Sequence, residues 1–243
     1  TTHIADAYGE RKKIYKDFIT DATDLVDVIH GNANLPKRTG FASGKYTKDV
    51  SEYVIGWILG TEWDPFFVKG TNDNNPDKNS YHGEYLYTED ASPFEAFLCE
   101  VGDKVLEYEI KKYRMTRALA FSNWPTTDML VHPKEPYAQE DMVAVNTEHI
   151  IANSKCLSGM FASYHIYPCY PDFINVDTKY VSFEDEDGKI NTYKAYLRDL
   201  FQEHTVPVVV AEYGIPSSRG KSHNNNFSGF HQGQHSEETQ GLI

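Results

Sequence analysis

Apolar residues follow two patterns along this chain. Continuous apolar runs bounded by turn residues predict strands buried on both faces, as in parallel sheets. Apolar residues at steps of three and four predict helices with one buried face. The predicted strands are 54–62, 118–125, 160–168 and 207–212. The predicted helices are 9–30, 92–114, a short one at 148–153 and 191–204, and a further one begins at Ser236.

Local signals refine this assignment. Ser92, Pro93 and Glu95 form a capping box with proline at the first helical position, so a helix is expected to begin there. Segments 31–50 and 64–90 are rich in polar and turn-forming residues and are predicted to be loops. Helices and strands alternate, which indicates an α/β fold with a parallel sheet and crossover helices.

Two of the predicted strands end in a glutamate. The run 207–211 leads into Glu212, and the run beginning at Val54 leads into Glu62. A lone glutamate at a strand end is usually a turn cap, but in barrels of parallel strands the carboxyl ends carry the chemistry. A pair suits a glycosidase, because one carboxyl must stay protonated for the leaving oxygen while the other must stay ionised.

On these motifs the chain resembles the retaining glycoside hydrolases of the TIM (β/α)8-barrel clan, over roughly residues 50–220. The resemblance implies that Glu62 ends the fourth strand as the general acid/base and Glu212 ends the seventh as the nucleophile. His165 and Tyr167 match the clan's His-x-Tyr motif on the sixth strand, and alternation along a strand puts both on one face. In that family the tyrosine hydroxyl bonds the nucleophile and lowers its pKa.

The residues around the two glutamates imply substrate contacts. Thr61 stands where the clan has an asparagine that bonds the sugar 2-hydroxyl, so the substrate subclass stays open. Trp63 is expected to form part of an apolar wall that favours the protonated acid. Further substrate contacts are expected at strand ends, from Asn123, Trp124 and Tyr213, although a plain turn explains Asn123 as well.

The number of predicted strands is smaller than a complete barrel requires. A TIM barrel has eight strands in typically about 250 residues, and only four are predicted here, corresponding to about strands 4 to 7. We therefore expect residues 1–243 to form a single catalytic barrel domain or a segment of one. The remaining strands would come from missing sequence or another chain; an open fold is the alternative. An open segment would leave two sheet edges exposed, so the isolated chain is expected to be insoluble, inactive or completed by another polypeptide.

The composition limits which classes of binding partner are expected. The net charge of −13 argues against nucleic acid or an anionic membrane surface. There is no apolar run long enough to span a membrane and no leader-like start, so neither a transmembrane helix nor a signal peptide is expected. The 17 Tyr, 13 Phe and 3 Trp suit sugar stacking and a plain core equally well. The expected partner is an oligosaccharide or polysaccharide.

No cofactor or metal is expected. Three cysteines, Cys99, Cys156 and Cys169, make no disulfide framework or C-x-x-C pattern and are expected to be buried. His223, His231 and His235 match no standard zinc spacing and are expected to line the substrate mouth or to face solvent.

A rival hypothesis is a catalytically silent carbohydrate-binding or scaffolding barrel domain. Thr61 favours it, whereas the presence of both glutamates and the His-x-Tyr motif argues against it. An unrelated α/β hydrolase is disfavoured because the chain has no G-x-S-x-G elbow.

Overall fold

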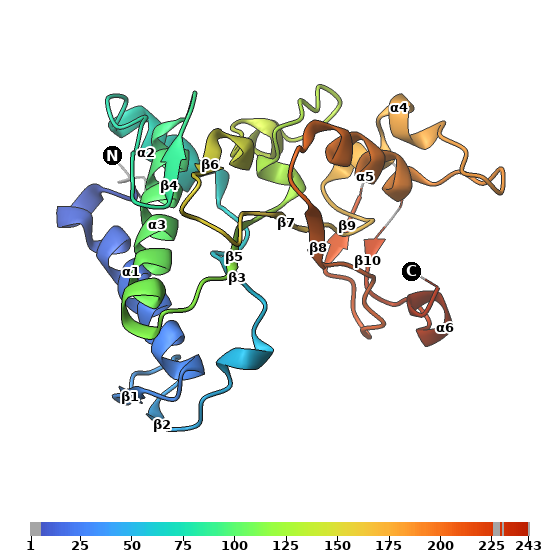
Figure 1. The fold of residues 1–243 in the computed structure, drawn as a ribbon. Coiled ribbons are helices and arrows are strands. Elements are labelled where there is room, and N and C mark those ends of the chain that lie inside the picture. The colour runs from blue at the N-terminus through green and yellow to red at the C-terminus, as the bar shows by residue number, and fades with distance from the viewer. Residues whose placement is uncertain (1–5, 226–228, 230, 243) are drawn as a thin grey trace. The chain divides into compact units, whose positions relative to one another are not determined.

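The structure, a computed structural model, describes residues 6–225, 229 and 231–242. The chain forms two compact units (Figure 1). The first comprises Thr1–Gly60, Phe66–Phe121 and Thr147–Phe161, and the second comprises Thr61–Pro65, Ser122–Asn146 and Ala162–Ile243.

Both units contain helices and strands (Figure 1). The helices are α1 (Gly9–Ile29), α2 (Pro65–Asn74), α3 (Pro93–Tyr113), α4 (Thr178–Val181), α5 (Thr192–Glu203) and α6 (Glu237–Gln240). The strands are β1 (Ala33–Leu35), β2 (Gly44–Tyr46), β3 (Gly56–Leu59), β4 (Leu86–Thr88), β5 (Ala118–Asn123), β6 (Ile150–Ala152), β7 (Ala162–His165), β8 (Val208–Glu212), β9 (His223–Asn224) and β10 (His231–Gln232).

The predicted parallel sheet is confirmed. Its hydrogen-bonded strand order is β3-β5-β7-β8, with all neighbouring pairs parallel. Residues 118–121 of β5 pair with β3 in the first unit, and residues 122–123 pair with β7 in the second. Among the described residues the sheet is open, with β3 and β8 as its edges. The fold is therefore α/β with four parallel strands.

The prediction that every strand is buried on both faces is wrong for the two edges. In β3, Trp57 and Leu59 are buried while Ile58 is 43% exposed. In β8, Val208 and Val210 pack against the core of the second unit, but Val209 is 42% exposed. Alternate residues of a strand point to opposite faces, so a strand covered on one side buries only every second residue.

The first unit contains the two longest helices, which pack against each other. Both were predicted, and the capping box of α3 is present: Ser92 Oγ accepts from the Glu95 amide at 3.3 Å, and Glu95 Oε2 accepts from the Ser92 amide at 2.7 Å. The buried Glu109 of α3 is bonded by Arg117, His30 and Trp57.

Three predictions in the first unit are wrong. Segment 31–50 contains the antiparallel pair β1–β2, segment 64–90 contains α2 and β4, and residues 150–152 form β6 where a short helix was expected. Strand β6 pairs with β4, from Leu86↔Ala152 to Thr88↔Ile150. These short elements carry weak local signals and form because a partner distant in sequence supplies the hydrogen bonds.

The second unit is built around an aromatic and aliphatic core. Tyr164 and Ile166 from β7 and the segment after it, together with Tyr196 and Leu200 from α5, are almost fully buried there. Asn191 caps α5 by accepting from the Lys194 amide at 3.0 Å, at the start of the helix predicted over 191–204. The three cysteines of the chain are buried and unpaired. Over the part of the chain that the structure describes, no helix has both the length and the apolarity to cross a membrane.

Candidate active site

Strand pairing in the second unit brings two of the predicted site residues together. His165 ends β7 and Glu212 ends β8, and the two are register partners in the parallel ladder. The Ile166 amide donates to the Glu212 carbonyl at 2.9 Å, which fixes this alignment just beyond the strand end. The carboxyl edge of the sheet therefore carries both side chains.

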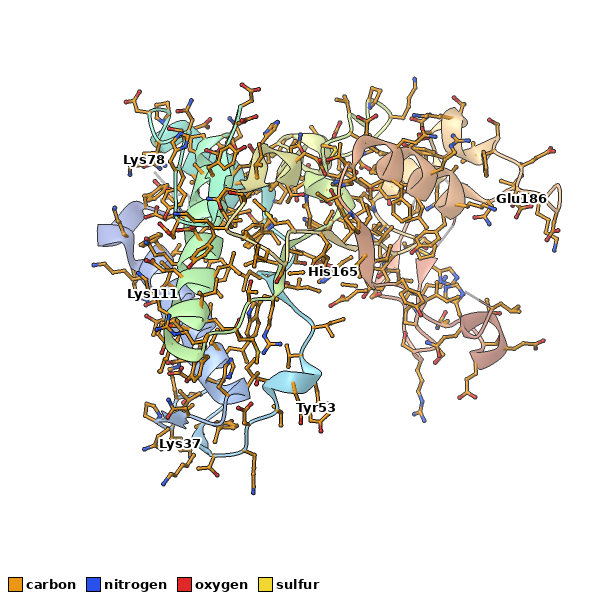
Figure 2. The ribbon with its side chains drawn as sticks, in the orientation of Figure 1. Lys37, Tyr53, Lys78, Lys111, His165 and Glu186 are labelled. Carbon is orange, nitrogen blue, oxygen red and sulfur yellow. The ribbon has the colours of Figure 1, made fainter. Side chains whose placement is uncertain are left out.

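Glu62 reaches the same place from the turn after β3. The predicted strand to Glu62 is shorter than expected and ends at Leu59, so Glu62 lies beyond the ladder. His165 Nδ1 lies 3.3 Å from Glu62 Oε1 and 3.5 Å from Glu212 Oε2 (Figure 2 labels His165). One oxygen or nitrogen atom from each of the three side chains lies within 4.8 Å of the others.

The three side chains differ in exposure. His165 is 11% exposed, whereas the Glu62 and Glu212 side chains are 37% and 50% exposed. The imidazole is thus largely buried, whereas a ligand can reach the two carboxylates from solvent.

Tyr167 holds the second carboxylate. Its hydroxyl donates to Glu212 Oε2 at 2.7 Å, which is the hydrogen bond that the resemblance to the glycoside hydrolase clan implied. Burial, aided by this bond and by the charge of Glu212, raises the pKa of Tyr167 to about 12. The phenol therefore stays protonated near neutral pH and acts as a donor to the carboxylate.

Ser122 belongs to the site although the sequence did not single it out. Its Oγ lies 3.2 Å from His165 Nε2, and the residue is 1% exposed. If the hydroxyl donates to Nε2, the neutral imidazole carries its hydrogen on Nδ1, the atom that faces both carboxylates. Strand register could have revealed this residue, because Ser122 pairs with Ser163 on β7, two positions before His165.

Asn123 and Trp124 have different surroundings. Asn123 is fully buried, and its amide bonds the carbonyls of Thr127 and Val145 while its Oδ1 accepts from Thr127 and Trp124. Its side chain organises the turn after β5. The Trp124 indole donates to the Trp63 carbonyl at 3.0 Å.

The remaining predicted contact residues differ in exposure. Trp63 is buried, Thr61 is exposed beside Glu62, and Tyr213 is 64% exposed directly after Glu212.

The C-terminal histidines form no compact ligand group among the described residues. His223 Nε2 pairs with Asp172 Oδ1 at 2.7 Å, and the rings of His231 and His235 stack with centroids 5.1 Å apart. The three residues whose ligand atoms converge are Glu62, His165 and Glu212.

No protein-family model matches this chain, and neither a curated protein nor a solved structure matches it. What the site does must therefore be argued from its own geometry.

Proposed function

We propose that this chain carries the catalytic pair of a retaining glycosidase or transglycosidase. The observation that carries the proposal is the approach of Glu62 and Glu212, with oxygens within 4.8 Å of each other, while Tyr167 donates to Glu212. Retaining enzymes keep their two carboxyl groups about 5–5.5 Å apart, whereas inverting enzymes separate them by about 6.5–9.5 Å to admit a water. The short approach supports the retaining class.

The roles follow from the hydrogen bonds. Glu212 accepts from a phenol that stays protonated, which holds the carboxylate in place and suits it to attack the anomeric carbon. Glu62 then protonates the departing oxygen, and afterwards removes a proton from the water that hydrolyses the glycosyl-enzyme. The substrate is an oligosaccharide or polysaccharide, and the four parallel strands are part of a (β/α)8 barrel in this proposal.

The test compares three variants on activated and unactivated glycosides. Glu212→Gln removes the nucleophile, so it should abolish glycosyl-enzyme formation on every substrate. Glu62→Ala should spare the first step for good leaving groups such as dinitrophenol, and slow poor ones by about 10²–10⁴-fold. Azide needs no general base, so it should restore turnover of Glu62→Ala alone. Glu203→Gln, an exposed carboxylate at the end of α5, is the matched control.

The outcomes separate the alternatives. Equal losses in both variants on all substrates, with no azide rescue, would show that the roles are misassigned. If neither variant loses activity, the glycosidase proposal fails. If saccharides bind but no glycoside is cleaved, the catalytically silent carbohydrate-binding domain is the better account.

A second candidate function is divalent-cation binding at the same three side chains. Two carboxylates and one imidazole whose ligand atoms converge within 4.8 Å form a donor set that suits Zn²⁺ or Mn²⁺. Calorimetric titration with either ion decides this: a metal site requires stoichiometric binding that His165→Ala removes. In a glycosidase, chelators should leave activity unchanged.

A further inference from the structure

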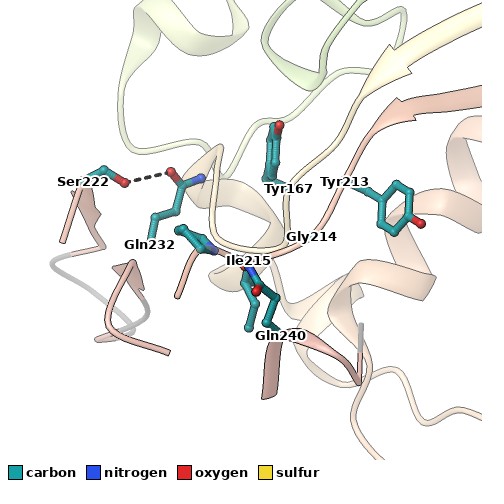
Figure 3. A pocket seen from close by; sticks show the side chains of 8 residues that line it. Tyr167, Tyr213, Gly214, Ile215, Ser222, Gln232 and Gln240 are labelled. Atoms are coloured by element: carbon teal, nitrogen blue, oxygen red, sulfur yellow. Dashed lines mark hydrogen bonds between the residues drawn. The ribbon is translucent and has the colours of Figure 1, made fainter. Parts of the chain in front are cut away.

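A cavity adjoins the nucleophile side of the site within the second unit. Its volume is about 640 Å³, and its lining includes Tyr167, Gly214, Ile215, Ser222, Gln232 and Gln240 (Figure 3). This volume falls within the range of small-molecule sites. Glu62, His165 and Glu212 are not among its lining residues. The cavity therefore lies beside the reacting position and shares Tyr167 with it.

Two carboxamides are held in fixed orientations at this cavity. Gln232 Oε1 accepts from Ser222 Oγ at 3.2 Å, and Figure 3 shows its amide nitrogen turned the other way, toward the side of Tyr167 and Ile215. Gln240 Nε2 donates to the Ile215 carbonyl at 2.7 Å. Among the described residues, these bonds leave the Gln232 amide nitrogen as a donor and the Gln240 side-chain oxygen as an acceptor for a ligand.

The backbone around the cavity is shaped by short elements. The β9–β10 pair sets Gln232 opposite His223, and the Ser222 amide donates to the Gln232 carbonyl at 2.8 Å. Gly214 has a φ of +112°, a conformation that favours glycine, and it turns the chain directly after the nucleophile strand. The carboxamide of Gln232 is thus placed by a hairpin rather than by a free loop.

The lining carries no acidic or basic side chain among the described residues. Its chemistry is amide, hydroxyl, phenol and aliphatic carbon, which matches the hydroxyls and apolar faces of an uncharged sugar. An anionic sugar would bring a second negative charge close to Glu212, and no described lining residue carries a positive charge to pair with it. The net charge of −13 further disfavours an anionic ligand.

From this geometry we propose that the cavity is a second sugar subsite, which binds a neutral sugar unit next to the one that reacts at Glu62 and Glu212. The inference rests on the proposed glycosidase function for the identity of the neighbouring site. It specifies the substrate as a neutral oligosaccharide of at least two units, and it excludes uronic-acid and sulfated chains.

The experiment measures binding and turnover separately. Binding of neutral gluco-, manno-, galacto- and xylo-tetrasaccharides and of an oligogalacturonate is titrated on the Glu212→Gln protein, in which no cleavage is expected. Turnover of the same neutral tetrasaccharides and of aryl monoglycosides is measured on the protein with Glu212 intact. Each measurement is repeated with Gln232→Ala, Gln232→Glu and Gln240→Ala, with Gln202→Ala as the matched control on the exposed face of α5.

At least one neutral tetrasaccharide should bind, and the oligogalacturonate should not. Loss of one hydrogen bond in Gln232→Ala or Gln240→Ala should weaken tetrasaccharide binding about 3- to 10-fold. The KM for the tetrasaccharide should rise by more than the KM for the monoglycoside. Gln202→Ala should leave tetrasaccharide binding and both KM values unchanged.

Other outcomes overturn the subsite or the function, and the two can be told apart. If Glu212→Gln abolishes hydrolysis but Gln232→Ala and Gln240→Ala bind tetrasaccharides as the parent protein does, the glycosidase stands and the subsite is wrong. Equal or tighter binding of oligogalacturonate also overturns the neutral-sugar assignment. If no glycoside is hydrolysed and yet Gln232 and Gln240 govern neutral tetrasaccharide binding, the subsite stands and the glycosidase function fails.

Discussion

At the scale of single residues, two hydroxyls hold the candidate site in place. Tyr167 donates to Glu212, and Ser122 bonds the imidazole of His165 from below. His165 in turn faces both carboxylates through one nitrogen. The positions of His165 and Glu212 thus depend on hydrogen bonds from neighbouring hydroxyls.

Under the proposed glycosidase function, removing the phenol donor should slow catalysis without unfolding the protein. A hydrogen bond to a charged group contributes about 1.5–3 kcal/mol, so Tyr167→Phe should lower kcat/KM by about 10- to 100-fold. Tyr137→Phe, with an exposed ring, is the control. An unchanged kcat/KM in Tyr167→Phe would remove Tyr167 from the proposed mechanism.

Ser122→Ala should act through His165. Without the hydroxyl, Nε2 loses its partner and either tautomer becomes available, so we expect kcat to fall about 3- to 10-fold with little change in KM. Ser122→Thr keeps the hydroxyl and should restore part of the loss. If the alanine and threonine variants behave alike, the hydroxyl has no positioning role.

At the scale of elements, a buried charge cluster joins α1, β3 and α3 in the first unit. Glu109 is fully buried, and its carboxylate accepts from Arg117 Nε at 2.8 Å, His30 Nε2 at 2.9 Å and Trp57 Nε1 at 2.7 Å. Arg117 also donates to the Val54 carbonyl just before β3. A buried carboxylate of this kind is tolerated because Arg117 supplies an opposite charge and three N–H donors bond its oxygens.

Arg117→Met should therefore destabilise the protein strongly. It leaves the Glu109 charge without its permanent cation, and breaking a buried pair in this way costs about 3–5 kcal/mol. The double variant Arg117→Met/Glu109→Leu removes both charges and should recover a large part of the loss. Urea denaturation measures the free energy of unfolding of the single and the double variant. A double variant less stable than Arg117→Met would contradict this account.

At the scale of the whole molecule, the parallel sheet ends in partly exposed strands. Ile58 in β3 and Val209 in β8 are 43% and 42% exposed. Open edges with apolar side chains favour association with other chains, and a lysine on the edge opposes it. This exposure is what an open α/β sheet produces when each edge strand is covered on one face only.

Val209→Lys should accordingly reduce self-association. Light scattering across a concentration series should show a lower average mass than the parent protein, with the urea midpoint nearly unchanged because the side chain is exposed. Val131→Lys is the control, since Val131 is 81% exposed but lies in a loop. If Val209→Lys and Val131→Lys lower the average mass equally, the effect comes from the added charge and not from the sheet edge.

The sequence alone determined the long helices, the capping of α3 and α5, and the four parallel strands. Their signals are local, because periodicity and capping residues act within a few positions of the chain. It also placed the carboxylate of Glu212 at a strand end, since the apolar run before it is a local signal. The bond from Tyr167 to Glu212 was expected only from the resemblance to the glycoside hydrolase clan.

Tertiary structure decided the rest. The hairpin β1–β2, the distant pair β4–β6 and the one-sided burial of β3 and β8 depend on which segment lies alongside. The register between β5 and β7 places Ser122 in the site. The cavity at Gln232 is lined by residues from segments that follow β7 and β8. These features depend on hydrogen-bond partners and packing surfaces that are distant in sequence. Such partners produce no periodic pattern along the chain, so only the folded structure shows them.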